Sequence, residues 1–215
     1  MKQHLFFLAT LAASLLLGFA SIPYLPDQVA IHWGPSGVAD GFTSKWFAIL
    51  LFPIILVVLQ LLLTFLPNKK GKNDTQSASY SDRTISLVQQ LIMLFVLVMH
   101  ILIIAENIWG SFSMGNMIIL LLGCLFIIIG NYMPRLKMNS YMGIRTPWSF
   151  KNEWVWKKTQ QAGGKIFFTG GVLLLILSIF ISESMIWIGL PVLLLVIILS
   201  VWISYFYSNK YEDQN

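Results

Sequence analysis

The hydrophobic positions of this 215-residue chain are gathered into six long runs that contain no Lys, Arg, Asp or Glu. A helix of about 20 apolar residues crosses a hydrocarbon layer about 30 Å thick, and in lipid each helix satisfies its own backbone hydrogen bonds. The pattern therefore predicts an all-α polytopic protein of the cell membrane with six transmembrane helices. The runs cover about residues 5–22, 46–66, 85–105, 115–133, 166–182 and 186–207.

Composition supports this class, because only 11% of the residues are charged whereas soluble domains carry about 25%. Basic residues accumulate in the cytoplasmic loops of membrane proteins. With a cytoplasmic N-terminus, every one of the 14 basic residues except Lys45 falls on the inner side. We therefore expect both termini in the cytoplasm, and we interpret the net charge of +5 as a topology signal, without direct nucleic-acid binding.

The first run has a second interpretation. Lys2 followed by Leu5–Ala20 is also typical of a cleaved signal peptide. Phe19-Ala20-Ser21 is a poor cleavage site, so we expect the first span to be retained.

The spans and loops predict a modular organisation. We expect an N-terminal two-span module over 1–66, a flexible cytoplasmic linker over 67–84, a four-span module over 85–207 and a cytoplasmic tail over 208–215. Gly163 and Gly170 share a helix face, as do Gly164 and Gly171, which predicts close packing of the fifth span against a neighbour.

The outer loop, residues 23–45, is too long for a simple connection. Val29–Trp33 favours an extended backbone and Gly34–Gly37 is rich in turn residues. We expect a compact folded loop in which Asp40 bonds nearby backbone amides. Thr43 or Ser44 is expected to cap the second span. His32 is a weak metal-ligand candidate, and His100, near the outer end of the third span, could in principle join it, although no ligand spacing supports the pair.

The inner loop, residues 134–165, is basic and rich in tryptophan. Gly143 suits a turn, and Ser149 or Asn152 is expected to start a short helix that Gly163-Gly164 ends. Lysines interleaved with aromatic side chains suit an anionic lipid surface or a protein partner. The pattern is equally typical of an ordinary positively charged inner loop.

Motifs of catalysis are not evident in the sequence. It contains no phosphate-binding glycine loop, zinc motif or nucleophile elbow, so we predict neither an enzyme nor a bound metal or cofactor. Pumps usually carry a charged residue in mid-membrane, and the runs carry none. A small permease or exporter of peptides or amphipathic compounds is the alternative function. A membrane enzyme that uses His32 and Asp40 is a third possibility.

Both informative loops resemble the SdpI family. The outer stretch Ile22-Pro23…His32-Trp33…Gly37…Asp40…Ser44-Lys45 is similar to its N-terminal membrane module. The inner signature is Gly130-Asn131-Tyr132-Met133-Pro134-Arg135…Asn139…Gly143-Ile144-Arg145-Thr146-Pro147-Trp148…Glu153…Val155-Trp156-Lys157-Lys158-Thr159…Gly163-Gly164. One departure is Gln160, where family members often have His.

The resemblance implies immunity to a secreted membrane-active peptide toxin. It also implies a receptor that holds a cytoplasmic transcriptional repressor at the membrane. On this interpretation the toxin meets the outer loop, at His32, Trp33, Gly37, Asp40 and Lys45. The repressor meets the inner loop, at Asn131, Pro134, Arg135, Lys137, Gly143, Arg145, Thr146, Pro147, Trp148, Trp156 and Lys157.

Overall fold

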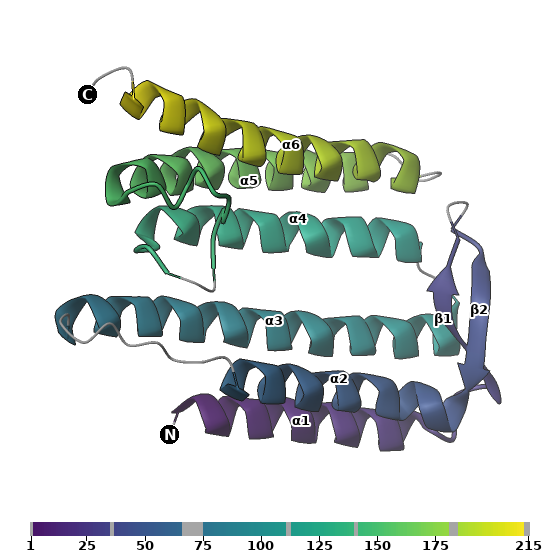
Figure 1. The fold of residues 1–215 in the computed structure, drawn as a ribbon. Helices are drawn as coiled ribbons and strands as arrows, with labels where there is room; N and C mark the ends of the chain where they lie inside the picture. The colour runs from purple at the N-terminus through teal and green to yellow at the C-terminus, as the bar shows by residue number, and fades with distance from the viewer. Residues whose placement is uncertain are drawn as a thin grey trace.

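The computed structural model describes residues 2–34, 37–65, 75–110, 113–139, 142–180 and 185–212. Within them six helices are long and apolar enough to span a membrane, which confirms the predicted fold class. They lie side by side in one bundle (Figure 1). The helices are α1 (Lys2–Ser21), α2 (Lys45–Phe65), α3 (Thr75–Trp109), α4 (Met114–Tyr132), α5 (Glu153–Phe180) and α6 (Met185–Glu212).

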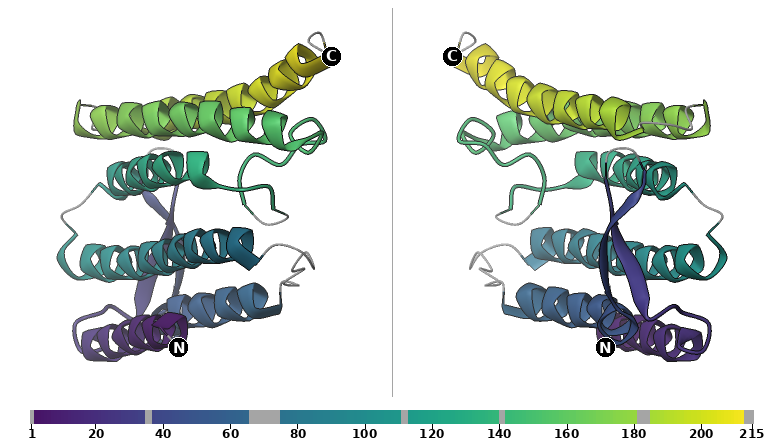
Figure 2. Two further views of the ribbon diagram at one scale, coloured as in Figure 1. Left: turned by 90° about the vertical axis from the view of Figure 1, so that its left-hand side faces the viewer. Right: turned by 90° about the vertical axis from the view of Figure 1, so that its right-hand side faces the viewer.

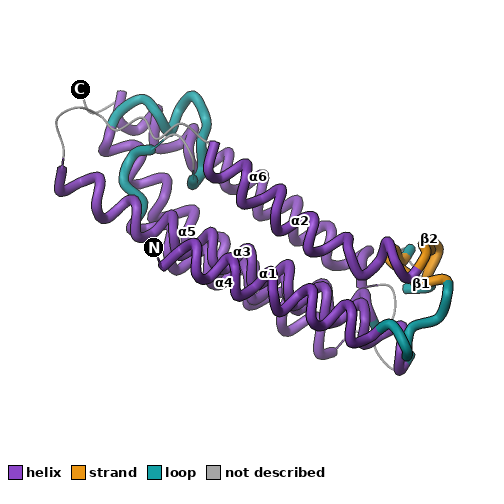
Figure 3. The backbone as a smooth tube through the Cα atoms, turned by 90° about the horizontal axis from the view of Figure 1, so that it is seen from below, coloured by secondary structure: helices purple, strands orange, loops and turns teal. Residues whose placement is uncertain are grey.

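A two-stranded antiparallel sheet is added to the helices. β1 (Gln28–Trp33) pairs with β2 (Ala39–Ser44), so the compact outer loop is a β-hairpin. The hairpin crosses one end of the bundle, which we call the outer end (Figures 1 and 3). The loop between α4 and α5, which starts with the 3₁₀ turn η1 (Met133–Arg135), lies at the opposite, inner end.

The helices group as three and three in space, whereas the sequence pattern suggested two and four. α3 packs mainly on α1 and α2, while α4, α5 and α6 pack on one another (Figure 2). The two groups meet near the outer end, where Met114 of α4 is buried against Phe52 and Ile103.

Two predicted boundaries were wrong. α3 already begins at Thr75, so part of the expected linker 67–84 is helical, while residues 66–74 lie outside the described residues. α5 begins at Glu153 and continues through Gly163-Gly164, where the sequence predicted a break. The glycines do not end the helix, because the absence of their side chains lets α4 approach Gly164 and lets Ile144 of the inner loop approach Gly163.

The close packing of α5 is confirmed by its glycines. A Cβ on Gly164 would lie 2.7 Å from the carbonyl oxygen of Gly130, and one on Gly171 would lie 2.6 Å from that of Gly123. Two glycine pairs therefore let the backbones of α4 and α5 approach closely, as small residues do between membrane helices. Gly170 faces α6 instead, where a Cβ would lie 2.4 Å from Val196 Cγ2.

Candidate functional site

The hairpin is held against α3 by the side chain of Asn107. Its Nδ2 donates to the carbonyl oxygen of Ala30 at 2.9 Å, and its Oδ1 accepts from the Ala30 N–H at 2.8 Å. The Nδ2 also donates to the carbonyl oxygen of Ile103 at 2.8 Å. Asn107 therefore gives β1 the donor and acceptor that a neighbouring strand would supply. Sequence reasoning missed this residue, because an Asn at the end of an apolar run carries no distinctive signal.

His32 and Asp40 contact each other on the surface of the hairpin. Nδ1 of His32 lies 2.5 Å from Oδ1 of Asp40, and the side chains are 71% and 53% exposed. Two glycines make room for the pair. A Cβ on Gly41 would lie 2.8 Å from His32 Cβ, and one on Gly34 would lie 2.8 Å from Asp40 Oδ2. The imidazole is thus the partner of the Asp40 carboxylate, in place of the backbone amides that the sequence suggested.

The base of the hairpin is closed by Lys45 and Asp27. Nζ of Lys45 lies 2.9 Å from Oδ1 of Asp27, and the Lys45 N–H donates to the Asp27 carbonyl oxygen at 3.2 Å. The hydrogen bond and charge of the ammonium hold the pKa of Asp27 below its ordinary value. Ser44 Oγ accepts from the Phe47 N–H at 3.3 Å, which confirms Ser44 as the cap of α2.

The remaining predicted residues of the hairpin have different environments. Gly37 has a φ of +76°, a conformation that favours glycine, and its N–H donates to the carbonyl oxygen of Gly34. Trp33 packs partly buried against the cluster around Phe52 and Met114, so it anchors the hairpin to the bundle. Exposed aromatic side chains of this end include those of Tyr24, Phe42, Trp46 and Trp109.

The inner loop is fixed by Gln160, which is fully buried on α5. Its Oε1 accepts from the Ile144 N–H at 3.0 Å, and its Nε2 donates to the Ile144 carbonyl oxygen at 3.0 Å. Gly143 lies directly beside this amide with a φ of +99°, and a Cβ there would lie 2.5 Å from Oε1. Gln160, the residue at which this chain departs from the family pattern, therefore supports the backbone of the inner loop.

A second support comes from Trp156, which is 2% exposed. Its Nε1 donates to the carbonyl oxygen of Leu136 at 2.9 Å and holds the segment after η1. Trp156 was predicted to contact a partner, but its burial leaves it a structural role. The ring of Pro134 packs against Gly164, where an added Cβ would lie 2.9 Å from Pro134 Cδ.

The Thr-Pro-Trp segment of the loop is tied to α6. Thr146 Oγ1 donates to Ser204 Oγ at 2.8 Å, and Ser149 Oγ accepts from the Thr146 N–H at 3.0 Å. The ring of Trp148 meets that of Tyr205 edge-on, with centroids 5.4 Å apart. Asn152 Oδ1 accepts from the Val155 N–H at 2.9 Å, so Asn152 caps α5 as predicted.

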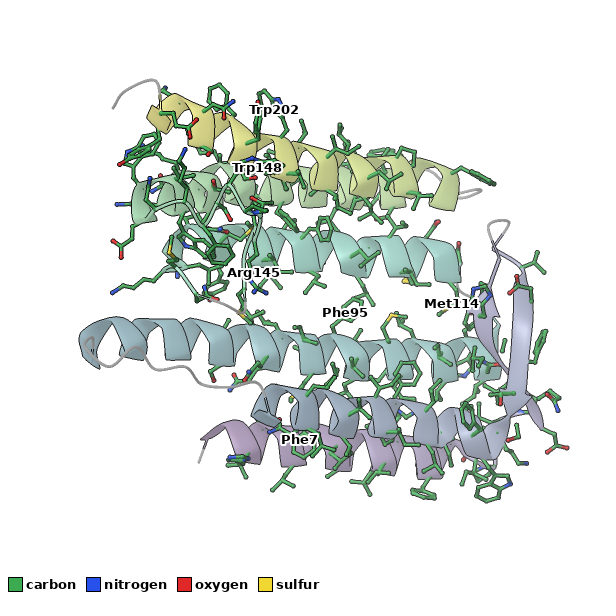
Figure 4. The ribbon with its side chains drawn as sticks, viewed as in Figure 1. Phe7, Phe95, Met114, Arg145, Trp148 and Trp202 are labelled. Atoms are coloured by element: carbon green, nitrogen blue, oxygen red, sulfur yellow. The ribbon has the colours of Figure 1, made fainter. Side chains whose placement is uncertain are left out.

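Arg145 is displayed between these fixed neighbours. Ile144 is bonded to Gln160 and Thr146 to Ser204, while Arg145 itself is exposed. Its guanidinium lies 5.8 Å from the centre of the Phe150 ring. Among the described residues it has no carboxylate partner. The side chain projects from the inner loop toward α3 (Figure 4).

Other exposed or partly exposed residues of the inner end extend this surface. Arg135 lies over the Tyr132 ring at 5.2 Å, and Lys158 over the Trp154 ring at 5.9 Å. Exposed predicted residues are Asn131, Pro134, Arg135, Lys137, Gly143, Arg145, Pro147, Trp148 and Lys157. The structure thus separates a displayed set from the buried supports Gln160 and Trp156.

His100 is buried among the helices and is not placed to bind a metal together with His32, as the sequence had allowed. It is 0% exposed, and its Nδ1 lies 2.8 Å from Ser14 Oγ of α1. Its ring stacks on Phe52 of α2 at 4.9 Å. It therefore joins α1, α2 and α3 and does not meet His32. In the described part of the chain no three His, Cys, Asp or Glu side chains gather as a metal site.

Comparisons with known proteins match two separate regions of the chain. Residues 135–207 match the SdpI/YfhL protein family, and residues 9–57 match a domain of unknown function, DUF1648. The immunity protein SdpI of Bacillus subtilis (strain 168) is 29% identical over 213 residues, which are 98% of each chain. No solved structure matches significantly. The two family matches lie in the regions that carry the outer hairpin and the inner loop, and over almost its entire length the chain is similar to a member of the SdpI family.

Proposed function

We propose that this chain is a membrane immunity protein that protects its own cell from a secreted, membrane-active peptide toxin. The observation that carries the proposal is the similarity to the immunity protein SdpI along almost the entire length of both chains. The protein would act by binding, since the two displayed surfaces contain recognition groups and require no chemical step.

The toxin would meet the outer hairpin. With the predicted topology the hairpin lies outside the cell, and Lys45 is the basic residue of this side. The hairpin offers the His32–Asp40 pair beside exposed aromatic side chains, such as Phe42 and Trp46. Amphipathic surfaces of this kind suit a peptide that itself partitions into membranes.

The repressor would meet the inner surface. Arg145 and Trp148 are exposed on a loop that is bonded to α5 through the Ile144 backbone and to α6 through the Thr146 side chain. Arginine and tryptophan are the side chains that most often dominate protein–protein recognition. An anchored loop loses little conformational freedom on binding, so such a surface is pre-organised for a partner.

Complementation tests the immunity proposal directly. The chain would be expressed in Bacillus subtilis 168 from which the gene for its own SdpI has been removed, in mixed culture with the unmodified parent. We expect survival to be restored to within about tenfold of the parent, while a vector control is killed. Equal killing of both strains would contradict immunity, provided that the chain is detected in the membrane fraction.

A further inference from the structure

The two edges of the hairpin are not equivalent. On β1 the N–H and C=O of Ala30 face away from β2, and Asn107 bonds both of them. A sheet edge that is covered in this way cannot accept another strand. The edge of β1 is therefore closed at its centre by the side chain of a helix.

The strand register shows which groups β2 presents on its other edge. Ala30 is paired with Phe42, and since the Ala30 amide groups point away from β2, those of Phe42 point away from β1. The Lys45 N–H donates to Asp27 across the hairpin. The backbone N–H and C=O of Thr43 therefore point toward β1, like the Lys45 N–H. Those of Phe42 and Ser44 point away from β1.

This second edge is unpaired in the part of the chain that the structure describes, because the sheet has two strands. β2 is the strand farther from the helices in Figure 1. The strand offers alternately exposed side chains, and Phe42 is 57% exposed at its centre. Exposed backbone donors and acceptors at an edge form a template for an extended chain.

The chemistry around the edge selects an apolar peptide. The charged groups next to the strand are paired, Asp40 with His32 and Lys45 with Asp27. Phe42 is exposed on the strand, and the exposed side chains of Val38 and Trp46 lie just before and just after it in the chain. An extended peptide with apolar side chains would satisfy the backbone groups of β2 without leaving a charge unpaired.

We propose that the free edge of β2 binds an extended segment of the peptide toxin as a third strand of the hairpin, with Phe42 at the centre of the contact. This inference rests on the proposed function and specifies its outer site. Recognition would depend on main-chain hydrogen bonds to the Phe42 N–H and C=O, with side-chain contacts at alternate positions.

A proline at position 42 tests binding at the β2 edge without disturbing the β1–β2 pairing. Because the Phe42 N–H faces outward, Phe42→Pro removes no β1–β2 hydrogen bond, and proline is tolerated at such an edge position. It does remove the donor that an added strand would use. Phe42→Ala is the matched control, since it removes the aromatic ring and keeps the N–H.

The probe is the toxin purified from the parent Bacillus subtilis strain by its killing of the strain without SdpI. Binding is measured with the full chain in lipid nanodiscs, together with amide hydrogen exchange. We expect the toxin to slow exchange at Phe42 and Ser44, Phe42→Pro to weaken binding about tenfold, and Phe42→Ala to weaken it less. Slow exchange at Thr43 in both variants shows that the hairpin is intact.

The possible failures are distinguishable. If the wild type protects cells and binds the toxin but Phe42→Pro does so equally well, the edge proposal is wrong and immunity stands. Equal losses in Phe42→Pro and Phe42→Ala would assign recognition to the ring and overturn strand addition. Protection of Phe42 that rises with protein concentration without toxin would show a second copy at the edge. If the wild type neither binds nor protects, both proposals fail.

Discussion

The outer hairpin and the inner loop are both held in fixed conformations at the ends of the bundle, but by different interactions. The hairpin keeps its shape through backbone pairing, and the partly buried Asn107 and Trp33 anchor it, so its other polar side chains lie on the surface. The inner loop has no strand pairing within the described residues, and buried side chains supply its support. Residues of a family motif can thus be read as displayed or supporting only when their burial is known.

The largest effect should follow from removing the support of the inner loop. Gln160→Leu leaves the N–H and C=O of Ile144 unpaired, and each buried orphan costs about 1–3 kcal/mol. We expect the free energy of unfolding to fall by about 2–6 kcal/mol, measured by thermal unfolding in micelles. Gln161→Leu, one position along the helix, is the control. Equal stability of the two variants would show that the loop does not depend on this amide.

Removing the Asn107 anchor should have a smaller effect on stability than removing the support of the inner loop. Asn107→Leu removes the bonds to Ala30 and Ile103, but the β1–β2 pairing remains. We expect local opening, with exchange of the Ala30 amide about 10- to 100-fold faster and little change in global stability. Asn107→Asp keeps the acceptor and should give an intermediate rate. Unchanged exchange in Asn107→Leu would contradict the anchoring role.

Displayed residues should affect recognition without affecting the fold. Arg145→Ala should change stability by no more than about 0.5 kcal/mol, as surface substitutions usually do. It should weaken retention of a fluorescently tagged repressor at the membrane about tenfold or more, and leave toxin survival unchanged. Lys165→Ala, a basic residue outside the displayed set, is the control. Retention that is equal in both variants would remove Arg145 from the proposed contact.

The smallest effect concerns the salt bridge at the base of the hairpin. The pKa of Asp27 is lower in the folded protein than its ordinary value of 3.8. The ion pair therefore stabilises the hairpin above that value, and the contribution is lost as the pH falls through the lowered pKa. Amide protection of β2 should decrease slightly below about pH 4. Asp27→Asn should abolish this dependence, and an identical pH profile in the variant would refute the assignment.

The sequence predicted the parts of the fold that depend on local pattern. Apolar runs identify the six spans, Ser44 and Asn152 cap their helices as expected, and the Val29–Trp33 segment is extended. These features follow from hydrophobicity and residue preferences within a few positions of the chain. They required no knowledge of tertiary contacts.

The candidate site was less predictable because its supports are distant in sequence. Gln160 lies 16 positions from Ile144, Asn107 lies 77 from Ala30, and His100 lies 86 from Ser14. No pattern within one element signals such pairs. The Gly163-Gly164 pair was predicted to end the helix, but Gly164 packs against α4 and Gly163 against Ile144 of the inner loop, so tertiary contacts require both glycines inside α5.

The length of α3 has a mechanical consequence. A helix of 35 residues measures about 52 Å, and a hydrocarbon layer is about 30 Å thick. Since Asn107 lies near the outer terminus, the excess of about 20 Å projects beyond the bilayer at the inner end (Figure 1). A helix is stiff along its axis, so a displacement of its outer terminus by the hairpin would also displace the projecting inner terminus, and α3 would shift against α1 and α2 in between.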